Sequence, residues 1–176
     1  MLPSRQVPEV SWYLPSLDLR PSPIHGAGVF AGAPIRRGEV VIVWGGRLLT
    51  SDDLAAGKGK SHTVVQIDDD LFLGALPSEE KTLDDYMNHS CDPTVWLRDA
   101  ITLETRRDIV ADEELTADYA TWLNNPKYRL QCRCGTEQCR RMVTGVDWML
   151  PKLHQAYGNH FATFLNSLIL SEAEKT

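Results

Sequence analysis

Residues 85–93 read Asp-Tyr-Met-Asn-His-Ser-Cys-Asp-Pro, with an amide, an imidazole, a hydroxyl and a thiol at four consecutive positions. A turn uses Asn, Ser, Asp and Pro for their backbone preferences, but it needs neither the histidine nor the cysteine. The segment therefore indicates binding or catalysis in addition to a turn, with Asn88, His89 and Cys91 as candidates. The alternative for His89 is a place in a hydrogen-bonded turn, without a role as general base.

The remaining cysteines, Cys132, Cys134 and Cys139, lie together in QCRCGTEQCR. With Cys91 they make four thiolates, the donor set of a tetrahedral zinc ion, and Gly135 permits the tight turn that such a knuckle needs. Four thiolates leave no open coordination position, so the metal would be structural. The alternative is that Cys91 is a buried free thiol and that the other three cysteines hold no metal.

Three further places offer weaker signals. HGAGVFA at 25–31 puts Gly26 and Gly28 before a strand, where backbone groups can approach a ligand closely, but the third glycine and the helix of a dinucleotide site are missing. Trp44, in WGG, could stack on a base or a cation, or pack in the core. Tyr119, three residues before Trp122, ends a short strand and either presents its hydroxyl to a cleft or packs in the core.

The elements that position these residues are mostly short strands. Apolar and β-branched runs predict strands at 28–32, 39–46, 62–67, 71–75, 94–98, 101–105 and 114–119. Turns at 68–70 and 99–100 predict two hairpins, and a helical period of apolar residues occurs at 151–157 and 160–170. The proline-rich start predicts an extended arm, and 51–60 is a polar insertion with one helical turn.

Composition limits the function classes. A chain of 176 residues with 43% hydrophobic and 24% charged residues is one globular domain. A net charge of −6 argues against nucleic-acid binding and favours a basic protein or peptide, although an acidic surface also serves solubility alone. No stretch predicts a signal peptide or a membrane span, so we expect a reducing cytoplasmic or nuclear location. Arg140 and Arg141 beside the cysteines leave a zinc-knuckle nucleic-acid binder as a weaker alternative.

Five segments in order, HGAGVFA, WGG, YMNHSCDP, EELTADY and CRCGTEQC, resemble the SET-domain protein-lysine N-methyltransferase family with its post-SET zinc segment, in a compact form such as bacteria also have. The resemblance spans about residues 20–145. It implies a mostly β (α+β) fold, β-clip-like, of small sheets with a pseudoknot. The expected parts are an N-terminal arm (1–19), a SET domain (20–122), a post-SET zinc knuckle (123–145) and a C-terminal helical extension (146–176).

The resemblance also implies an activity, methyl transfer from S-adenosylmethionine to the side-chain amine of lysine in a histone or another protein. Tyr119 is in the position of the catalytic tyrosine, and Tyr86 and Trp122 are candidates for the aromatic wall of the lysine channel. The expected cofactor contacts are Gly26, Ala27, Gly28, Trp44, Gly45, Asn88 and His89. The expected ligands of a structural Zn²⁺ ion are Cys91, Cys132, Cys134 and Cys139.

The chain departs from the family pattern at three places. Thr94 replaces an asparagine, Ala117 stands where an aromatic residue usually limits the number of methyl groups, and the tyrosine often found at His62 or Thr63 is absent. These departures leave product multiplicity open and support an alternative, a catalytically inactive SET-like interaction module. The C-terminal helices would pack on the domain, cover the substrate groove or form a homodimer contact.

Overall fold

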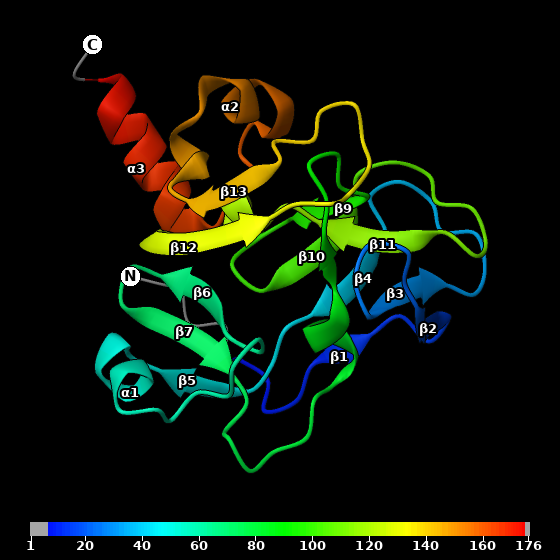
Figure 1. Cartoon of the computed structure of the whole chain (residues 1–176), viewed down its shortest axis with the longest axis horizontal. Coiled ribbons are helices and arrows are strands. Elements are labelled where there is room, and N and C mark those ends of the chain that lie inside the picture. The colour runs from blue at the N-terminus through cyan, green and yellow to red at the C-terminus, as the bar shows by residue number, and fades with distance from the viewer. Residues whose placement is uncertain (1–6, 175–176) are drawn as a thin grey trace.

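The structure, a computed structural model, describes residues 7–174 (Figure 1). Within these residues the chain forms four small β-sheets, three α-helices and three 3₁₀ turns, so the predicted mostly β fold is confirmed. Residues 1–6 of the predicted arm and 175–176 of the predicted extension lie outside the described residues. No helix in the described part of the chain is both long enough and apolar enough to cross a bilayer.

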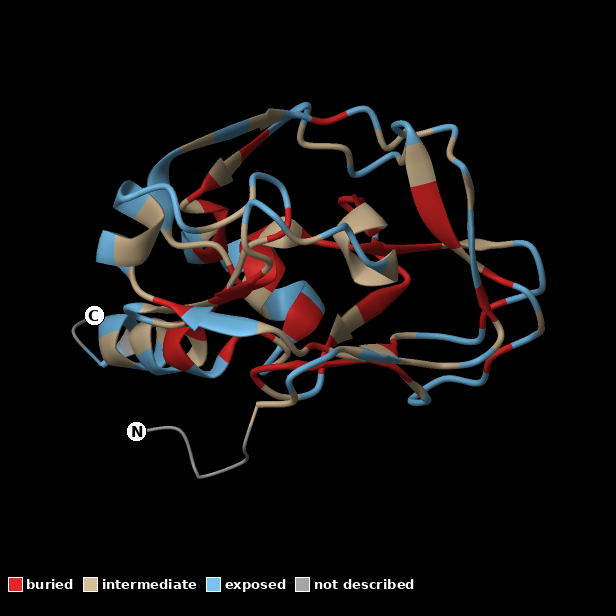
Figure 2. Cartoon of the chain, turned by 90° about the horizontal axis from the view of Figure 1, so that it is seen from below, coloured by how far each residue is buried: buried red, intermediate tan, exposed pale blue. Residues whose placement is uncertain are grey.

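Two four-stranded sheets form the body of the molecule. The first has the order β1-β4-β10-β9 and consists of Trp12–Tyr13, Val40–Val43, Thr102–Thr105 and Val95–Leu97. The second has the order β2-β3-β11-β8 and consists of Leu17–Pro21, Ala27–Ala31, Glu114–Ala117 and Asn88–His89. Buried apolar residues of both sheets belong to one core cluster, and Figure 2 colours the buried parts of the chain red.

Two smaller sheets lie at the edges of this body. The three-stranded sheet has the order β5-β7-β6 and consists of Arg47–Leu49, Leu71–Gly74 and Val65–Asp68, with the short helix α1, Ser51–Ala55, next to β5 in sequence. The two-stranded sheet pairs β12, Asn125–Gln131, with β13, Met142–Gly145, and so carries the cysteine cluster. Thr50 caps α1 through a reciprocal bond with Asp53.

The pairing of β8 with β11 brings together two segments that lie far apart in the sequence. The two strands are parallel, with Thr116 opposite Asn88 and Ala117 opposite His89. The 3₁₀ turn η2, Tyr119–Thr121, follows β11 directly, and Asp118 begins it by accepting a hydrogen bond from the Ala120 amide. The predicted meeting of the Asn88–His89 segment with the segment that ends at Tyr119 is therefore confirmed.

The C-terminal segment packs on the same core. It consists of the 3₁₀ turn η3, Asp147–Met149, and the helices α2, Pro151–Tyr157, and α3, Thr163–Ala173. Leu153, Tyr157, Phe161 and Leu165 are buried in the core cluster, so this segment packs on the parent domain as the amphipathic pattern predicted. A third 3₁₀ turn, η1, Leu83–Tyr86, precedes β8.

Most predicted elements are confirmed, and the differences have physical causes. The second helix begins at Thr163 and not at residue 160, because the His160 ring stacks on Trp96 and its Nδ1 meets the Leu97 carbonyl at 2.8 Å. Two strands begin within the predicted arm 1–19: residues 12–13 pair with β4, and residues 17–21 pair with β3. The hairpin β12–β13 was not predicted, because apolar and polar residues alternate only weakly along β12. Its residues are mostly exposed.

Candidate active site

A cleft of about 690 Å³ opens between the second four-stranded sheet and the three-stranded sheet, and its size is typical of small-molecule sites. Eight residues predicted from the sequence line it: Gly26, Ala27, Trp44, Gly45, Tyr86, Asn88, Tyr119 and Trp122. They come from four separate segments of the chain, so the fold assembles one site from the scattered motifs. The lining does not include Gly28 and His89.

Tyr119 stands at the start of η2 with its hydroxyl fixed. The phenol donates a hydrogen bond of 2.6 Å to the Met87 carbonyl, and the ring packs against Trp122 at 5.4 Å between centroids. Trp122 in turn meets Trp44 edge to face at 5.3 Å. Burial raises the pKa of Tyr119 far above its ordinary value, so the hydroxyl stays protonated and acts as a hydrogen-bond donor.

Asn88 holds the turn that precedes β3. Its Nδ2 lies 3.2 Å from the His25 carbonyl, 3.0 Å from the Ala27 carbonyl and 2.8 Å from Glu114 Oε1. These contacts occupy the amide nitrogen, so the amide oxygen is the atom that can accept a hydrogen bond from a ligand in the cleft. Gly26, at a φ of +54°, makes the turn that exposes its backbone there.

Glu114 is a supporting residue that sequence reasoning missed. Besides Asn88 it accepts hydrogen bonds of 2.8 and 2.9 Å from Ser22, and it lies directly behind Gly28. A Cβ atom at Gly28 would lie 2.1 Å from Glu114 Oε1, so the glycine leaves the space that the Glu114 side chain occupies. The glutamate of EELTADY was the available signal, since an acidic residue at a buried strand start needs partners.

The His89 side chain, 3% exposed, points into the protein. Its Nδ1 accepts a hydrogen bond of 3.3 Å from the Tyr119 amide, and its Nε2 lies 3.4 Å from Cys91 Sγ. Burial lowers the pKa of His89 to about 4, so the ring is neutral at physiological pH with its proton on Nε2. The imidazole thus connects the backbone of Tyr119 to the cysteine cluster, and cofactor contact by His89 stays a prediction.

Two residues at the cleft were not singled out from the sequence. Tyr128 reaches it from β12, and Ser11 lies at its other side, where it bonds to both the Gly45 amide at 3.0 Å and Asp84 at 2.8 Å. Both come from segments without an apolar pattern, and only the tertiary fold brings them to the site.

The cleft lining includes five acidic residues and two basic ones, Arg47 and Lys81. Glu9, Glu79, Glu80, Asp84 and Asp85 are all part of its lining. The acidic runs at 68–70 and 112–114 do not line it. Burial raises the pKa of Asp85, whereas Glu9 and Glu80 are exposed. The negative charge predicted from the sequence is therefore concentrated, in part, at the site itself.

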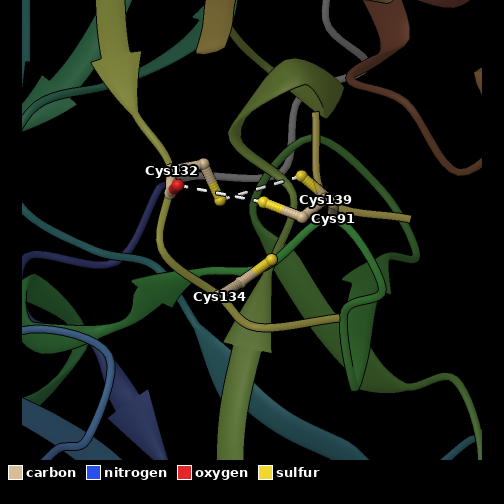
Figure 3. A group of neighbouring side chains, drawn as sticks. All are labelled: Cys91, Cys132, Cys134 and Cys139. Carbon is tan, nitrogen blue, oxygen red and sulfur yellow. Dashed lines mark hydrogen bonds between the residues drawn. The ribbon is translucent and has the colours of Figure 1, made fainter. Parts of the chain in front are cut away.

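The four cysteines form a second cluster behind the cleft. Their sulfur atoms lie within 4.8 Å of one another and point toward a common centre, with Cys91 Sγ 3.8 Å from Cys132 Sγ (Figure 3). Two sulfurs on one tetrahedral zinc ion lie about 3.8 Å apart, because each Zn–S bond is about 2.3 Å. The cluster therefore fits a tetrahedral ion, and all four thiols are free of disulfides.

The four thiols do not ionise equally, since burial raises the pKa of Cys91 to about 11 and that of Cys132 still further. Burial opposes ionisation of Cys134, but hydrogen bonds from the Cys91 backbone and from Thr136 outweigh it and lower the pKa of Cys134 to about 6. Gly135, at a φ of +73°, makes the turn between the second and third cysteines of the knuckle, as predicted. The Arg140 amide donates to Cys91 Sγ at 3.3 Å and so joins the knuckle to the end of β8.

Comparison with known proteins identifies the family. The SET domain model matches residues 26–120, more than half of the chain, and the chain therefore belongs to the SET-domain family. It is 33% identical over 135 residues to human histone-lysine N-methyltransferase SETD1A, covering 68% of this chain and 8% of that protein. It is 30% identical over 152 residues to Su(var)3-9 of Drosophila melanogaster, covering 67% of this chain and 23% of that protein.

Solved structures agree on the fold. The structure of KRYPTONITE in complex with mCHG DNA and SAH matches with a TM-score of 0.58 at 22% identity, covering 72% of this chain and 28% of that one. SUVH6 of Arabidopsis thaliana in complex with SAM matches with a TM-score of 0.60 at 19% identity, covering 72% of this chain and 32% of that one. At such identities the likeness establishes the fold alone. The chain spans less than a quarter of the two curated relatives named above.

Proposed function

We propose that this chain transfers a methyl group from S-adenosylmethionine to the side-chain amine of a lysine in a protein substrate. The observation that carries the proposal is the buried Tyr119 hydroxyl, which donates to the Met87 carbonyl at the wall of the cleft. The relatives named histone-lysine N-methyltransferases and the solved neighbours holding SAM or SAH support the reaction and its cofactor.

In this proposal the turn at 25–27 and the end of β4 hold the cofactor. Gly26, Ala27 and Gly45 offer backbone groups, Trp44 flanks the ligand, and Asn88 accepts a hydrogen bond. Gly28 and His89 lie outside the lining, and the cofactor contacts assigned to them would be made by backbone groups.

The chemistry needs alignment more than acid–base catalysis. The pKa of a lysine amine is about 10.4 in water, so the amine must first lose a proton. The neutral amine then attacks the sulfonium methyl group in line. Tyr119 stays protonated and so does not serve as the base. Its hydroxyl oxygen and the Met87 carbonyl orient the amine and the methyl group, and the faces of Tyr86, Trp122 and Tyr128 form an aromatic wall for the alkyl ammonium.

The substrate in this proposal is a basic segment of a histone or of another protein. The five acidic residues of the cleft lining support this, because they would attract lysine and arginine residues beside the target. The Lys81 ammonium lies 5.5 Å from the centroid of the Tyr86 ring. This cation–π contact supports a role for Tyr86 in binding a cationic side chain.

The four thiols in this proposal hold a structural Zn²⁺ ion. The convergence of their sulfur atoms and the lowered pKa of Cys134 support it. The ion would join β8 to the hairpin β12–β13 and would have no open position for substrate.

A catalytically inactive SET-like interaction module is the second candidate. Ala117 is buried on β11 with no side chain at the cleft, and His62, at a φ of +63°, supplies no aromatic hydroxyl where many relatives have a tyrosine. Binding of S-adenosylmethionine without transfer to any protein would favour this candidate.

The test is transfer of a labelled methyl group from S-adenosylmethionine by the zinc-loaded protein to histones and to a whole-cell protein extract. We expect label on lysine, and none with the Tyr119→Phe variant. Absence of label with the wild-type protein despite saturating cofactor contradicts the proposed activity, and equal label with Tyr119→Phe contradicts the role given to Tyr119.

Three further expectations stay predictions. The first is the division of the chain into four parts that end at residues 19, 122, 145 and 176. The second is the cytoplasmic or nuclear location, and the third is a homodimer contact through the C-terminal helices. The match at 26–120 supports the second domain boundary, and the histone-directed relatives support a nuclear location.

A further inference from the structure

We propose that Tyr157, on the C-terminal helix α2, is a positioning residue that acts on Tyr119 through Asp118. The inference rests on the proposed function, which assigns the catalytic role to Tyr119. It concerns a part of the chain beyond residue 120, where the match to the SET-domain family ends.

Asp118 lies at the centre of a buried polar network. Its carboxylate is fully buried, and Oδ2 accepts hydrogen bonds from Tyr157 Oη at 2.9 Å and from Arg140 at 2.6 Å. Oδ1 accepts from Arg140 at 2.7 Å and from the Ala120 amide at 3.0 Å. Each donor restricts the orientation of a buried carboxylate, and a lost donor leaves part of its hydrogen-bonding capacity unsatisfied.

The network continues to the opposite face of Arg140. Its Nε lies 2.8 Å from Asp147 Oδ2, and Asp147 accepts a hydrogen bond of 2.6 Å from Thr144. Arg140 follows Cys139 directly, so the arginine joins the cysteine knuckle to the C-terminal segment as well as to Asp118.

Asp118 is adjacent to Tyr119 in the chain, so movement of the one displaces the other. The Tyr119 amide donates to His89 Nδ1, which lies 3.7 Å from Asp118 Oδ1. A rotation of the Asp118 carboxylate would therefore tilt the backbone from which the Tyr119 ring projects. It would also lengthen the bond from the Tyr119 hydroxyl to the Met87 carbonyl.

Tyr157 is itself held in a single orientation. Its ring is buried beneath the Arg106 guanidinium, 5.4 Å from the ring centroid, and packs against Phe161 at 5.9 Å. Arg106 is fixed by an ion pair with Asp92 at 2.7 Å. The hydroxyl therefore points at Asp118 because the ring cannot turn away.

A second contact supports the same turn from its other end. The Ala162 amide, between α2 and α3, donates a hydrogen bond of 2.7 Å to the Thr121 carbonyl. The C-terminal segment thus binds Asp118, one residue before Tyr119, and Thr121, two residues after it. The turn η2 that carries the tyrosine is fixed at both ends by residues outside the family match.

The test compares Tyr157→Phe, which removes only the hydroxyl, with Leu165→Ala, which removes buried volume on α3 and has no polar atom to lose. Both are prepared as zinc-loaded protein of residues 1–176 and studied at a temperature where both are folded. The measurements are the melting temperature, kcat, the Kd for S-adenosylmethionine and the ¹⁹F spectrum of protein labelled with 3-fluorotyrosine. The Tyr119 signal is assigned by its loss in Tyr119→Phe.

We expect Tyr157→Phe to lower kcat by about tenfold with a change in Kd below about twofold, and to shift the Tyr119 signal. We expect Leu165→Ala to lower the melting temperature while kcat per folded molecule and the Tyr119 signal stay as in the wild type. An unchanged kcat and an unchanged Tyr119 signal in Tyr157→Phe would overturn the inference. So would parallel losses of kcat and stability in both variants.

If the wild-type protein transfers no methyl group, the proposed function fails and the spectra decide this inference alone. A Tyr119 signal that shifts in Tyr157→Phe and not in Leu165→Ala supports the positioning role. A Tyr119 signal that both variants leave in place refutes it.

Discussion

Asn88 and Tyr119 lie at one cleft but make different contacts, one to the turn before β3 and the other to the Met87 carbonyl. We expect Asn88→Ala to raise the Kd for S-adenosylmethionine by about tenfold, which corresponds to one lost hydrogen bond and a loosened turn. Titration calorimetry measures it, with Asn159→Ala, at an exposed position away from the cleft, as the control. An unchanged Kd would show that Asn88 serves the fold alone.

The protonated state of Tyr119 predicts the pH dependence of the reaction. Burial stabilises the neutral phenol, so the pKa lies above the ordinary value of about 10 and the hydroxyl does not ionise in the accessible range. We expect kcat/KM for a peptide substrate to rise from pH 7 to pH 10 as the substrate amine loses its proton. A decline on the alkaline side, attributable to ionisation of Tyr119, would contradict this.

The glycine of β3 shows how one residue constrains the site. A Cβ atom in Gly28→Ala would displace Glu114, which is bonded to both Ser22 and Asn88. We expect a loss of about 1–3 kcal/mol in the free energy of unfolding and weaker cofactor binding. The loss should be smaller in a Glu114→Ala background, where the space is open. Chemical denaturation of the four proteins measures this coupling, and additive losses would refute it.

At the scale of elements, the hairpin β12–β13 depends on the cysteine cluster. Cys134→Ser should abolish stoichiometric zinc binding and speed hydrogen exchange of backbone amides in this hairpin, because one ligand of four is lost. Elemental analysis and exchange mass spectrometry measure both, with Arg133→Ser, at the exposed neighbouring position, as control. Full zinc content in the serine variant would contradict the four-thiolate site.

The sequence predicted those features that depend on residues close together in the chain. The helix at 151–157 has proline at its first position and an apolar period, and it forms over the predicted residues. The cysteine spacing likewise predicted a cluster that the fold closes with Cys91. Glu114, Tyr128 and Ser11 could not be predicted as site residues, because strand pairing and sheet packing bring them to the cleft from segments with no distinctive pattern.

At the scale of the whole molecule, the net charge of −6 is partly concentrated at the cleft. We expect the double variant Glu9→Gln/Glu80→Gln to raise the KM for a basic peptide by about fivefold at low salt, since each exposed charge contributes roughly 0.5 kcal/mol. The effect should shrink as salt is added. The control Asp69→Asn/Glu137→Gln changes net charge equally at exposed positions outside the lining. If both double variants raised the KM equally, recognition of the peptide by the acidic residues of the cleft would be excluded.

The catalytic role of Tyr119 is best tested by single-turnover methyl transfer by Tyr119→Phe with S-adenosylmethionine bound in advance, with the cofactor Kd measured on the same sample. We expect the rate of transfer to fall at least about a hundredfold, because an orienting hydroxyl is lost from the reacting centre, while Kd changes less than about threefold. Equal losses in rate and affinity would contradict it and would place Tyr119 among the residues that only hold the cofactor.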